Sequence, residues 1–141
     1  MEYWERMDRR KAYLLTVKAG DTVAIMSGGS YTTVNDAKVR KVTATQIVVE
    51  GHTPSFPRRF KIDGGKEIGE GKSYYTAELI DPEWASEHRA SREAERNFNR
   101  LVHKLVDTRW SRFDAAQLQR IVDVVTAVET ESEEQRAKEA F

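Results

Sequence analysis

Basic side chains are concentrated in two short stretches of this sequence, each with the alternation expected of a β-strand. The six residues are Lys38, Arg40, Lys41, Arg58, Arg59 and Lys61. Cations of this kind follow the phosphates of a nucleic acid, and aromatic rings stack on its bases. Rings of this kind lie nearby at Tyr31, Phe56, Phe60 and Tyr74, of which Phe60 and Tyr74 are the candidates for the site itself. If the two stretches form neighbouring strands, the pattern predicts one surface that binds nucleic acid or a phosphorylated ligand.

The same six cations have a purely structural interpretation. Lysine and arginine that alternate with apolar residues keep the outer face of a sheet soluble and discourage its edges from pairing with other chains. Small β-barrels nevertheless often bind nucleic acid through their surface. Both interpretations stay open at the level of the sequence.

A second candidate surface is apolar and has helical spacing. Its residues recur every three or four positions, which places them on one face of a helix. They are Phe98, Leu101, Val102, Leu105 and Val106. A row of basic residues from Arg89 to Lys104 runs along the same segment, and nearby glutamates can pair with it. We expect the apolar face to contact either a host protein or a second copy of the chain.

Residues suited to catalysis or metal binding do not form a recognisable set. The sequence has no cysteine, and its three histidines, His52, His88 and His103, lack metal-ligand spacing. The segment Gly65–Ser73 approaches a phosphate-binding loop, but the spacing between its first glycine and the final Gly-Lys-Ser is one residue too long. We therefore expect a protein that is not an enzyme and that uses no metal and no cofactor.

Charge is balanced overall but unevenly distributed. The chain of 141 residues has 23 basic and 23 acidic side chains, so a polyanion site must be local. Residues 85–112 contain seven Lys or Arg against four acids, whereas residues 113–141 contain three against seven. No apolar run is long enough to span a membrane, and the first residues do not resemble a signal peptide. We expect a cytoplasmic protein with no membrane partner.

The basic stretches belong to a glycine-punctuated, β-branched half of the chain. Strands are expected at Thr22–Met26, Lys38–Thr43, Gln46–Glu50 and Arg58–Ile62, with Tyr13–Val17 leading in and Tyr74–Ile80 closing. Residues 66–73 are expected to form a polar loop. A short helix or arm over residues 1–13 would precede a small SH3-like β-barrel at residues 14–80.

Two helices are expected after the barrel. Asp81-Pro82-Glu83 is a helix start, and the helix should continue to about Thr108. Asp114 and Gln117 form a capping box for a second helix with its own apolar face. Two such helices joined by a short loop predict an antiparallel hairpin at residues 81–130, followed by a frayed charged tail at 131–141. The fold class is therefore α+β.

Several segments resemble known proteins. Lys18–Gly28, Lys38–Val42 and Ile47–Val49 resemble a KOW or SH3-like small barrel. Four further features are similar to small barrel-plus-helix proteins encoded by bacteriophages of actinobacteria: Arg58-Arg59-Phe60, Gly65–Gly69, Trp110 and Asp114–Ile121. The resemblance implies an architecture and a phage origin, but it does not supply a chemistry.

Together these observations predict a non-enzymatic phage accessory protein in the cytoplasm of the infected host, with a barrel that binds nucleic acid or a phosphorylated ligand. One alternative is an interaction module that contacts a host protein or self-assembles through the helices. Another is a small-molecule sequestering protein with a pocket lined by Tyr74, Tyr75 and Trp84.

Overall fold

The computed structural model describes residues 2–28, 32–69 and 77–140. The chain divides into two compact units, Met1–Arg96 and Asn97–Phe141. The boundary lies within helix α2 (Pro82–Asp107), so a single helix contributes to both units.

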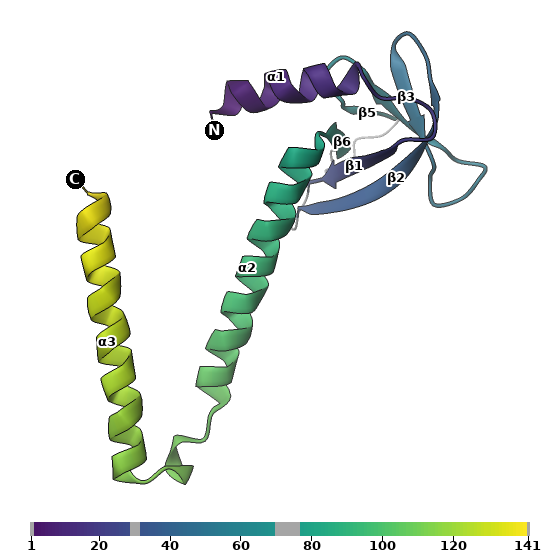
Figure 1. The fold of residues 1–141 in the computed structure, drawn as a ribbon. Helices are drawn as coiled ribbons and strands as arrows, with labels where there is room; N and C mark the ends of the chain where they lie inside the picture. Colours follow the sequence, from purple (N-terminus) through teal and green to yellow (C-terminus); the bar gives the residue numbers. More distant parts are fainter. Residues whose placement is uncertain (1, 29–31, 70–76, 141) are drawn as a thin grey trace. The chain divides into compact units, whose positions relative to one another are not determined.

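The first unit is built around a six-stranded antiparallel sheet (Figure 1). Its order is β5-β4-β3-β2-β1-β6. The two edges meet, because Lys66 forms a bridge with Glu78 and the Leu79 N–H donates to the Gly65 carbonyl at 2.8 Å. The sheet is thus a nearly closed barrel, which confirms the expected α+β class of a small barrel followed by helices. The strands are β1 (Thr22–Ser27), β2 (Thr33–Val42), β3 (Gln46–Val49), β4 (Arg58–Lys61), β5 (Glu67–Ile68) and β6 (Ala77–Ile80).

A glycine pair makes the closure possible. Gly64 and Gly65 lie between β4 and β5 and have φ angles of 83° and 70°. Residues other than glycine rarely adopt this backbone conformation. A Cβ atom on Gly65 would also lie 2.9 Å from the Leu79 carbonyl oxygen and 3.0 Å from the Leu14 side chain. The expected polar loop at 66–73 therefore begins as a short strand; residues 70–73 lie outside the described ranges.

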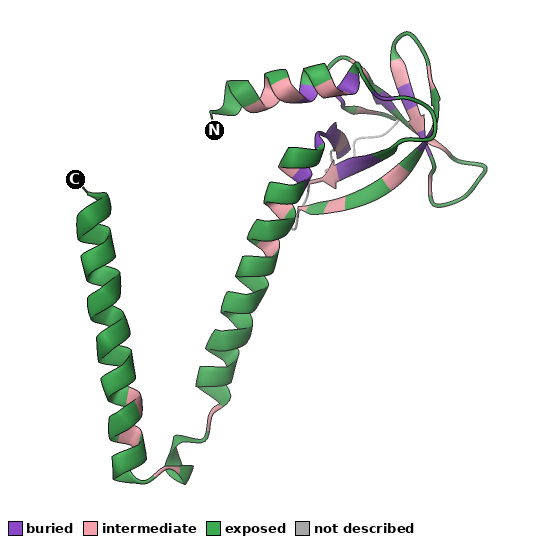
Figure 2. Ribbon diagram, in the orientation of Figure 1, coloured by how far each residue is buried: buried purple, intermediate pink, exposed green. Residues whose placement is uncertain are grey.

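Alternation along the strands fills the barrel interior (Figure 2). Val39 on β2, Ile47 and Val49 on β3, and Phe60 on β4 are all at most 2% exposed. Their chain neighbours point outward because successive strand residues face opposite sides. The remaining core side chains of this cluster are Leu14, Val17, Val23, Ile25, Ala77 and Leu79.

A β-bulge interrupts the alternation in β2. Val39 pairs with Val49, but Lys41 pairs with Val48, so Arg40 is an extra residue on its strand. Val42 then returns to the interior opposite Ile47. The bulge explains why two consecutive cations, Arg40 and Lys41, stand between two inward-facing valines.

The chain begins with helix α1 (Tyr3–Leu14) rather than with a strand that enters the barrel. The expected strand at 13–17 is therefore wrong, while the expected N-terminal helix is present. The apolar residues of this segment are buried by docking the helix end on the barrel instead, since Leu14 is 1% and Val17 is 6% exposed.

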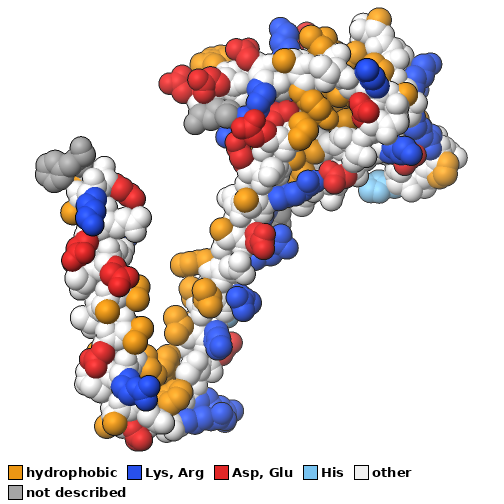
Figure 3. Space-filling model, viewed as in Figure 1, with side chains coloured by type: hydrophobic (Ala, Val, Ile, Leu, Met, Phe, Trp, Pro, Cys, Tyr) orange, Lys and Arg blue, Asp and Glu red, His pale blue; other side chains and the backbone are white. Residues whose placement is uncertain are grey.

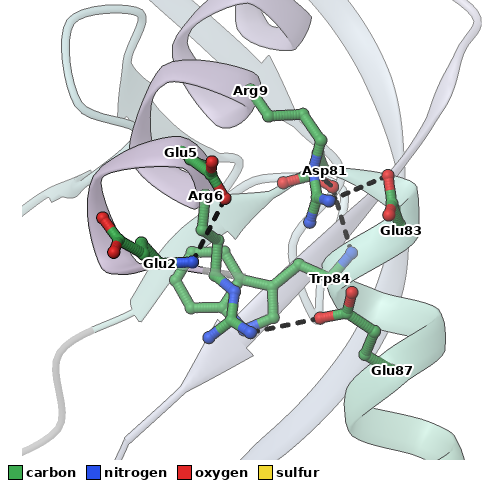
Figure 4. A network of polar contacts seen from close by, with 8 residues as sticks. All are labelled: Glu2, Glu5, Arg6, Arg9, Asp81, Glu83, Trp84 and Glu87. Atoms are coloured by element: carbon green, nitrogen blue, oxygen red, sulfur yellow. Dashed lines mark hydrogen bonds and ion pairs between the residues drawn. The ribbon is translucent and has the colours of Figure 1, made fainter.

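Ion pairs join α1 to the start of α2 (Figure 4). Arg9 reaches Asp81 at 2.9 Å and Glu83 at 2.8 Å, and Arg6 reaches Glu87 at 3.2 Å. The Arg6 guanidinium also lies 5.1 Å from the centre of the Trp84 ring. This network holds the N-terminal helix against the start of α2, and Arg10 joins the same helix to β6 through Glu78 at 2.6 Å.

The capping residues behave as their sequence predicts. Asp81 accepts from the Trp84 N–H at 3.0 Å at the start of α2, and Asp114 and Gln117 form the capping box of α3 (Ala115–Glu139). A 3-10 turn, η1 (Trp110–Arg112), joins the helices, which is consistent with the expected hairpin. Helix α3 continues through the charged tail, from residue 131 to Glu139.

Candidate nucleic-acid interface

The two basic stretches lie in one sheet, on the two strands that flank β3. Lys41 pairs with Val48, and Val48 pairs with Arg59, so the two cations stand in one row across the sheet. Strands β2 and β4 are therefore about 10 Å apart, twice the ordinary strand spacing. Val48 lies between buried Ile47 and Val49, which places its row on the outer face.

Further cations extend this row on both sides. Lys61 is opposite Gln46, and its N–H donates to the Lys66 carbonyl at 2.8 Å, so Lys66 lies beside it. Lys38 lies next to Glu50, whose N–H donates to the Lys38 carbonyl at 2.9 Å. We call this surface the basic face; it consists of Lys38, Arg40, Lys41, Arg59, Lys61 and Lys66.

The charges of the basic face are exposed and largely uncompensated. All six residues are exposed, and within the described ranges none of them forms an ion pair with an acidic side chain. Among the described residues, two acids occupy paired positions of this face: Glu50 next to Lys38, and Glu78 opposite Lys66, which is already paired with Arg10. Lys41 and Arg59, on strands about 10 Å apart, lie roughly one Debye length from each other. Together the six cations create a positive potential that attracts a polyanion.

Arg58 does not belong to the basic face. It shares the orientation of buried Phe60, two residues later, and its guanidinium lies 5.4 Å from the centre of that ring. Its Nε and Nη2 atoms each donate to Glu67 at 2.8 Å. The bidentate contact raises the pKa of Arg58 above its usual value. The positive charge of Arg58 is therefore compensated by Glu67, and the residue stabilises the barrel. This differs from its expected role in binding.

Of the aromatic candidates, Phe60 does not contribute a ring to the basic face. It is 0% exposed in the core, so it cannot stack on a base. Tyr31 and Tyr74 lie outside the described residues, as does Tyr75 of the alternative small-molecule pocket. Trp84, the third residue of that pocket, packs beneath Arg6 and Arg10 at 5.1 and 5.6 Å.

Phe56, another of the aromatic residues expected near the basic stretches, lies on the β3–β4 loop. Phe56 is 76% exposed. Two contacts hold its loop in place. Arg40 Nη1 donates to the Pro54 carbonyl at 3.0 Å. The backbones of Gly51 and Phe56 also approach each other closely, so that a Cβ atom on Gly51 would lie 1.9 Å from the Phe56 carbonyl oxygen. The bond from Arg40 ties the loop to the basic face.

The apolar candidates on α2 are all exposed. Their exposed fractions range from 39% for Val102 to 72% for Val106, with Phe98, Leu101 and Leu105 between them. Figure 3 shows hydrophobic side chains open to view along the helices.

Features of other functional classes can be reported for the described residues. No three His, Cys, Asp or Glu side chains within those ranges come together as a metal site. None of the helices in the described part of the chain is both long and apolar enough to cross a membrane.

Comparison with known proteins assigns the chain to a phage-associated family. No curated protein and no solved structure matches it. A family model described as the phage ProQ C-terminal-like domain, however, matches residues 1–136, which include the barrel, α2 and most of α3. The chain therefore belongs to the phage ProQ C-terminal-like domain family.

Proposed function

We propose that the chain is a non-enzymatic phage accessory protein that binds single-stranded nucleic acid on the basic face of its barrel. It acts in the cytoplasm of the infected bacterium, an actinobacterium as the sequence resemblance implies. The observation that supports this function most strongly is the row Lys41–Val48–Arg59 across β2, β3 and β4.

The electrostatic part of the argument concerns where the charge lies. The whole chain has no net charge, so attraction of a polyanion depends on local charge rather than on total charge. The basic face concentrates six exposed cations, and of the two acids at its paired positions Glu78 is already held by Arg10. Within the described ranges none of the six cations forms an ion pair, so binding of a polyanion would not have to break one there.

The preference for a single strand follows from Phe56. A ring that is 76% exposed on a braced loop loses little conformational freedom when it stacks on a base. Stacking of this kind requires an unpaired base, whereas phosphate contacts alone would also accept a duplex. A free phosphorylated ligand would use the cations but would leave the ring without a partner.

The test is the affinity of the full chain for a labelled single-stranded oligonucleotide, measured by fluorescence anisotropy at several salt concentrations. The double variant Lys41→Glu with Arg59→Glu removes two cations from the central row. We expect its affinity to fall by more than about tenfold and its salt dependence, log K against log salt, to flatten by about 1.4. Phe56→Ala should weaken the single strand more than a duplex of the same sequence.

A matched control makes the same charge change elsewhere. Lys11→Glu with Lys138→Glu alters two exposed lysines, one on α1 and one on α3. This variant should bind nearly as well as the wild type if the site is local. If both double variants lost the same affinity, binding would depend on the total charge of the chain and not on a local site. Undiminished affinity of the Lys41 and Arg59 variant would refute the proposal.

A further inference from the structure

The second unit of the chain has no interior of its own. None of the described residues from 97 to 140 is buried, although two helices occupy most of this length. Isolated helices gain most of their stability by packing an apolar face, and those without such packing are marginal in water. The helices of this unit therefore require a surface to pack against.

The exposed apolar surface is wider than a pair of helices can cover. At 100° per residue, the five apolar residues of α2 between Phe98 and Val106 span roughly 140° of its circumference. On the same measure, α3 has an apolar arc of roughly 160°. The seam between two helices alone is narrow, whereas each helix of a four-helix bundle contacts two neighbours. The residues of the α3 arc are Leu118, Ile121, Val122, Val124, Val125 and Val128.

The charges on the two helices are complementary. Within the second unit, residues 97–112 have four basic side chains and one acidic side chain, and residues 113–141 have three and seven, so their net charges are +3 and −4. Antiparallel packing brings the basic segment of one helix beside the acidic segment of another. A surface with nearly equal amounts of both signs complements itself, whereas a strongly acidic or basic partner would meet repulsion from one of the two helices.

We propose that the second unit is a dimerisation module whose partner is a second copy of the chain. Two α2–α3 hairpins form a four-helix bundle related by a twofold axis, with the apolar arcs inside and the basic and acidic segments of different copies side by side. The interface is isologous, so the same patch serves both subunits.

Dimerisation would place two basic faces on one particle. A nucleic acid bound to one face would then meet the second at a high effective concentration, which raises the overall affinity without new contacts. The proposal itself concerns only the helices, so it holds or fails independently of the proposed function.

The test is the molar mass of the full chain by light scattering, with helix content followed by circular dichroism. The wild type should have twice the chain mass of 16.2 kDa at micromolar concentrations. Its helices should also melt at a temperature that rises with protein concentration. Leu101→Glu with Leu105→Glu should give a monomer with reduced helix content.

Two further variants keep the result interpretable. Asn99→Glu with His103→Glu adds the same charge at the same spacing on α2 but outside the apolar arc, and should remain dimeric. Val122→Glu with Val125→Glu should dissociate the dimer from the α3 side. A monomeric wild type with fully formed helices would overturn the proposal, and so would dimers that survive in both arc variants.

Discussion

Arg58 and Arg59 are neighbours in the chain, yet they lie on opposite faces of β4 and have different environments. Arg58 is held by Glu67 at the barrel interior and is only partly exposed, at 27% of its side chain. Arg59 is exposed and has no ion-pair partner among the described residues. The side chain of Arg58 points toward Glu67 and has a structural role, whereas the side chain of Arg59 points outward and is the one proposed to bind. The two roles differ because successive residues of a strand face opposite sides.

We therefore predict opposite phenotypes for the two neighbours. Arg58→Gln should lower the free energy of unfolding by about 1–2 kcal/mol, because Glu67 loses its bidentate partner. Its affinity for a single-stranded oligonucleotide should change little. Arg59→Gln should leave stability nearly unchanged, while the salt dependence of binding flattens by about 0.7. Urea unfolding and anisotropy on both variants check the prediction, and equal behaviour of the pair would contradict it.

Tyr13 gives a prediction on alkaline stability. Burial, followed by the nearby charges of Asp21 and Asp81, raises the pKa of its phenol above the usual value of 10.0. Below about pH 10 the phenol is neutral in both the folded and the unfolded chain. Above this pH it ionises first in the unfolded chain, so the wild type should lose stability relative to Tyr13→Phe. Urea unfolding of both proteins at about pH 8 and about pH 10.5 measures this difference, which should not change if the shift is absent.

Part of the residue-level result was available from the sequence. The six cations of the two stretches could be recognised by their alternation, but their placement in one sheet depends on the strand order, in which β3 lies between β2 and β4. The opposite orientation of Arg58 also follows from alternation once Phe60 is known to be buried, because the two residues are two positions apart. The Glu67 contact does not follow, because β5 has only two residues and its pairing with β4 is set by the Gly64-Gly65 turn.

At the scale of elements, the bulge in β2 determines how many cations reach the outer face. Without the extra residue, Val39, Lys41 and Val42 would alternate regularly. We predict that deletion of Arg40 leaves the barrel folded, because the inward positions stay in register with β3. Binding should weaken, since one cation and the bond to Pro54 are lost. Proton NMR and anisotropy provide the two measurements.

Deletion of Val48 is the corresponding control on β3. It would shift every following residue of the strand to the wrong face, so Val49 would leave the core. This variant should not fold. If the Arg40 deletion unfolds the barrel as completely as the Val48 deletion, the assigned register is incorrect.

Helix α1 depends on one apolar anchor at its end. Leu14 is 1% exposed and contacts the barrel core, whereas its neighbour Leu15 is 72% exposed. Leu14→Ala should cost about 2–4 kcal/mol of unfolding free energy, and Leu15→Ala should cost less than about 0.5 kcal/mol. Thermal and urea unfolding compare the two. Similar costs at both positions would mean that α1 is not docked as described.

The elements differ in how visible they were in the sequence. Clear apolar patterns mark strands β1, β3 and β4 and both long helices. The two helices also have recognisable capping residues. The first half of β2, from Thr33 to Ala37, is polar and becomes a strand through pairing with β1, which no local pattern reveals. Residues 13–17 are apolar enough for a strand, but tertiary packing makes their first two residues the last turn of α1.

At the scale of the whole molecule, the proposed binding and the proposed association belong to different units. The first unit, residues 1–96, has a buried core and a basic face, while residues 97–140 have helices whose apolar arcs are not buried. Added salt should separate the two activities. Phosphate binding weakens steeply as salt rises, whereas contacts between apolar helix faces respond little.

The most direct test of the central claim is a map of the binding site at residue resolution. Backbone amide NMR of the full chain, titrated with a short single-stranded oligonucleotide, reports which residues contact it. The basic-face account predicts that the largest shifts fall on Lys41, Val48, Arg59 and the Phe56 loop, and that they vanish in the variant Lys41→Glu with Arg59→Glu. Shifts centred on α2 and α3, or no shifts at all, would contradict it.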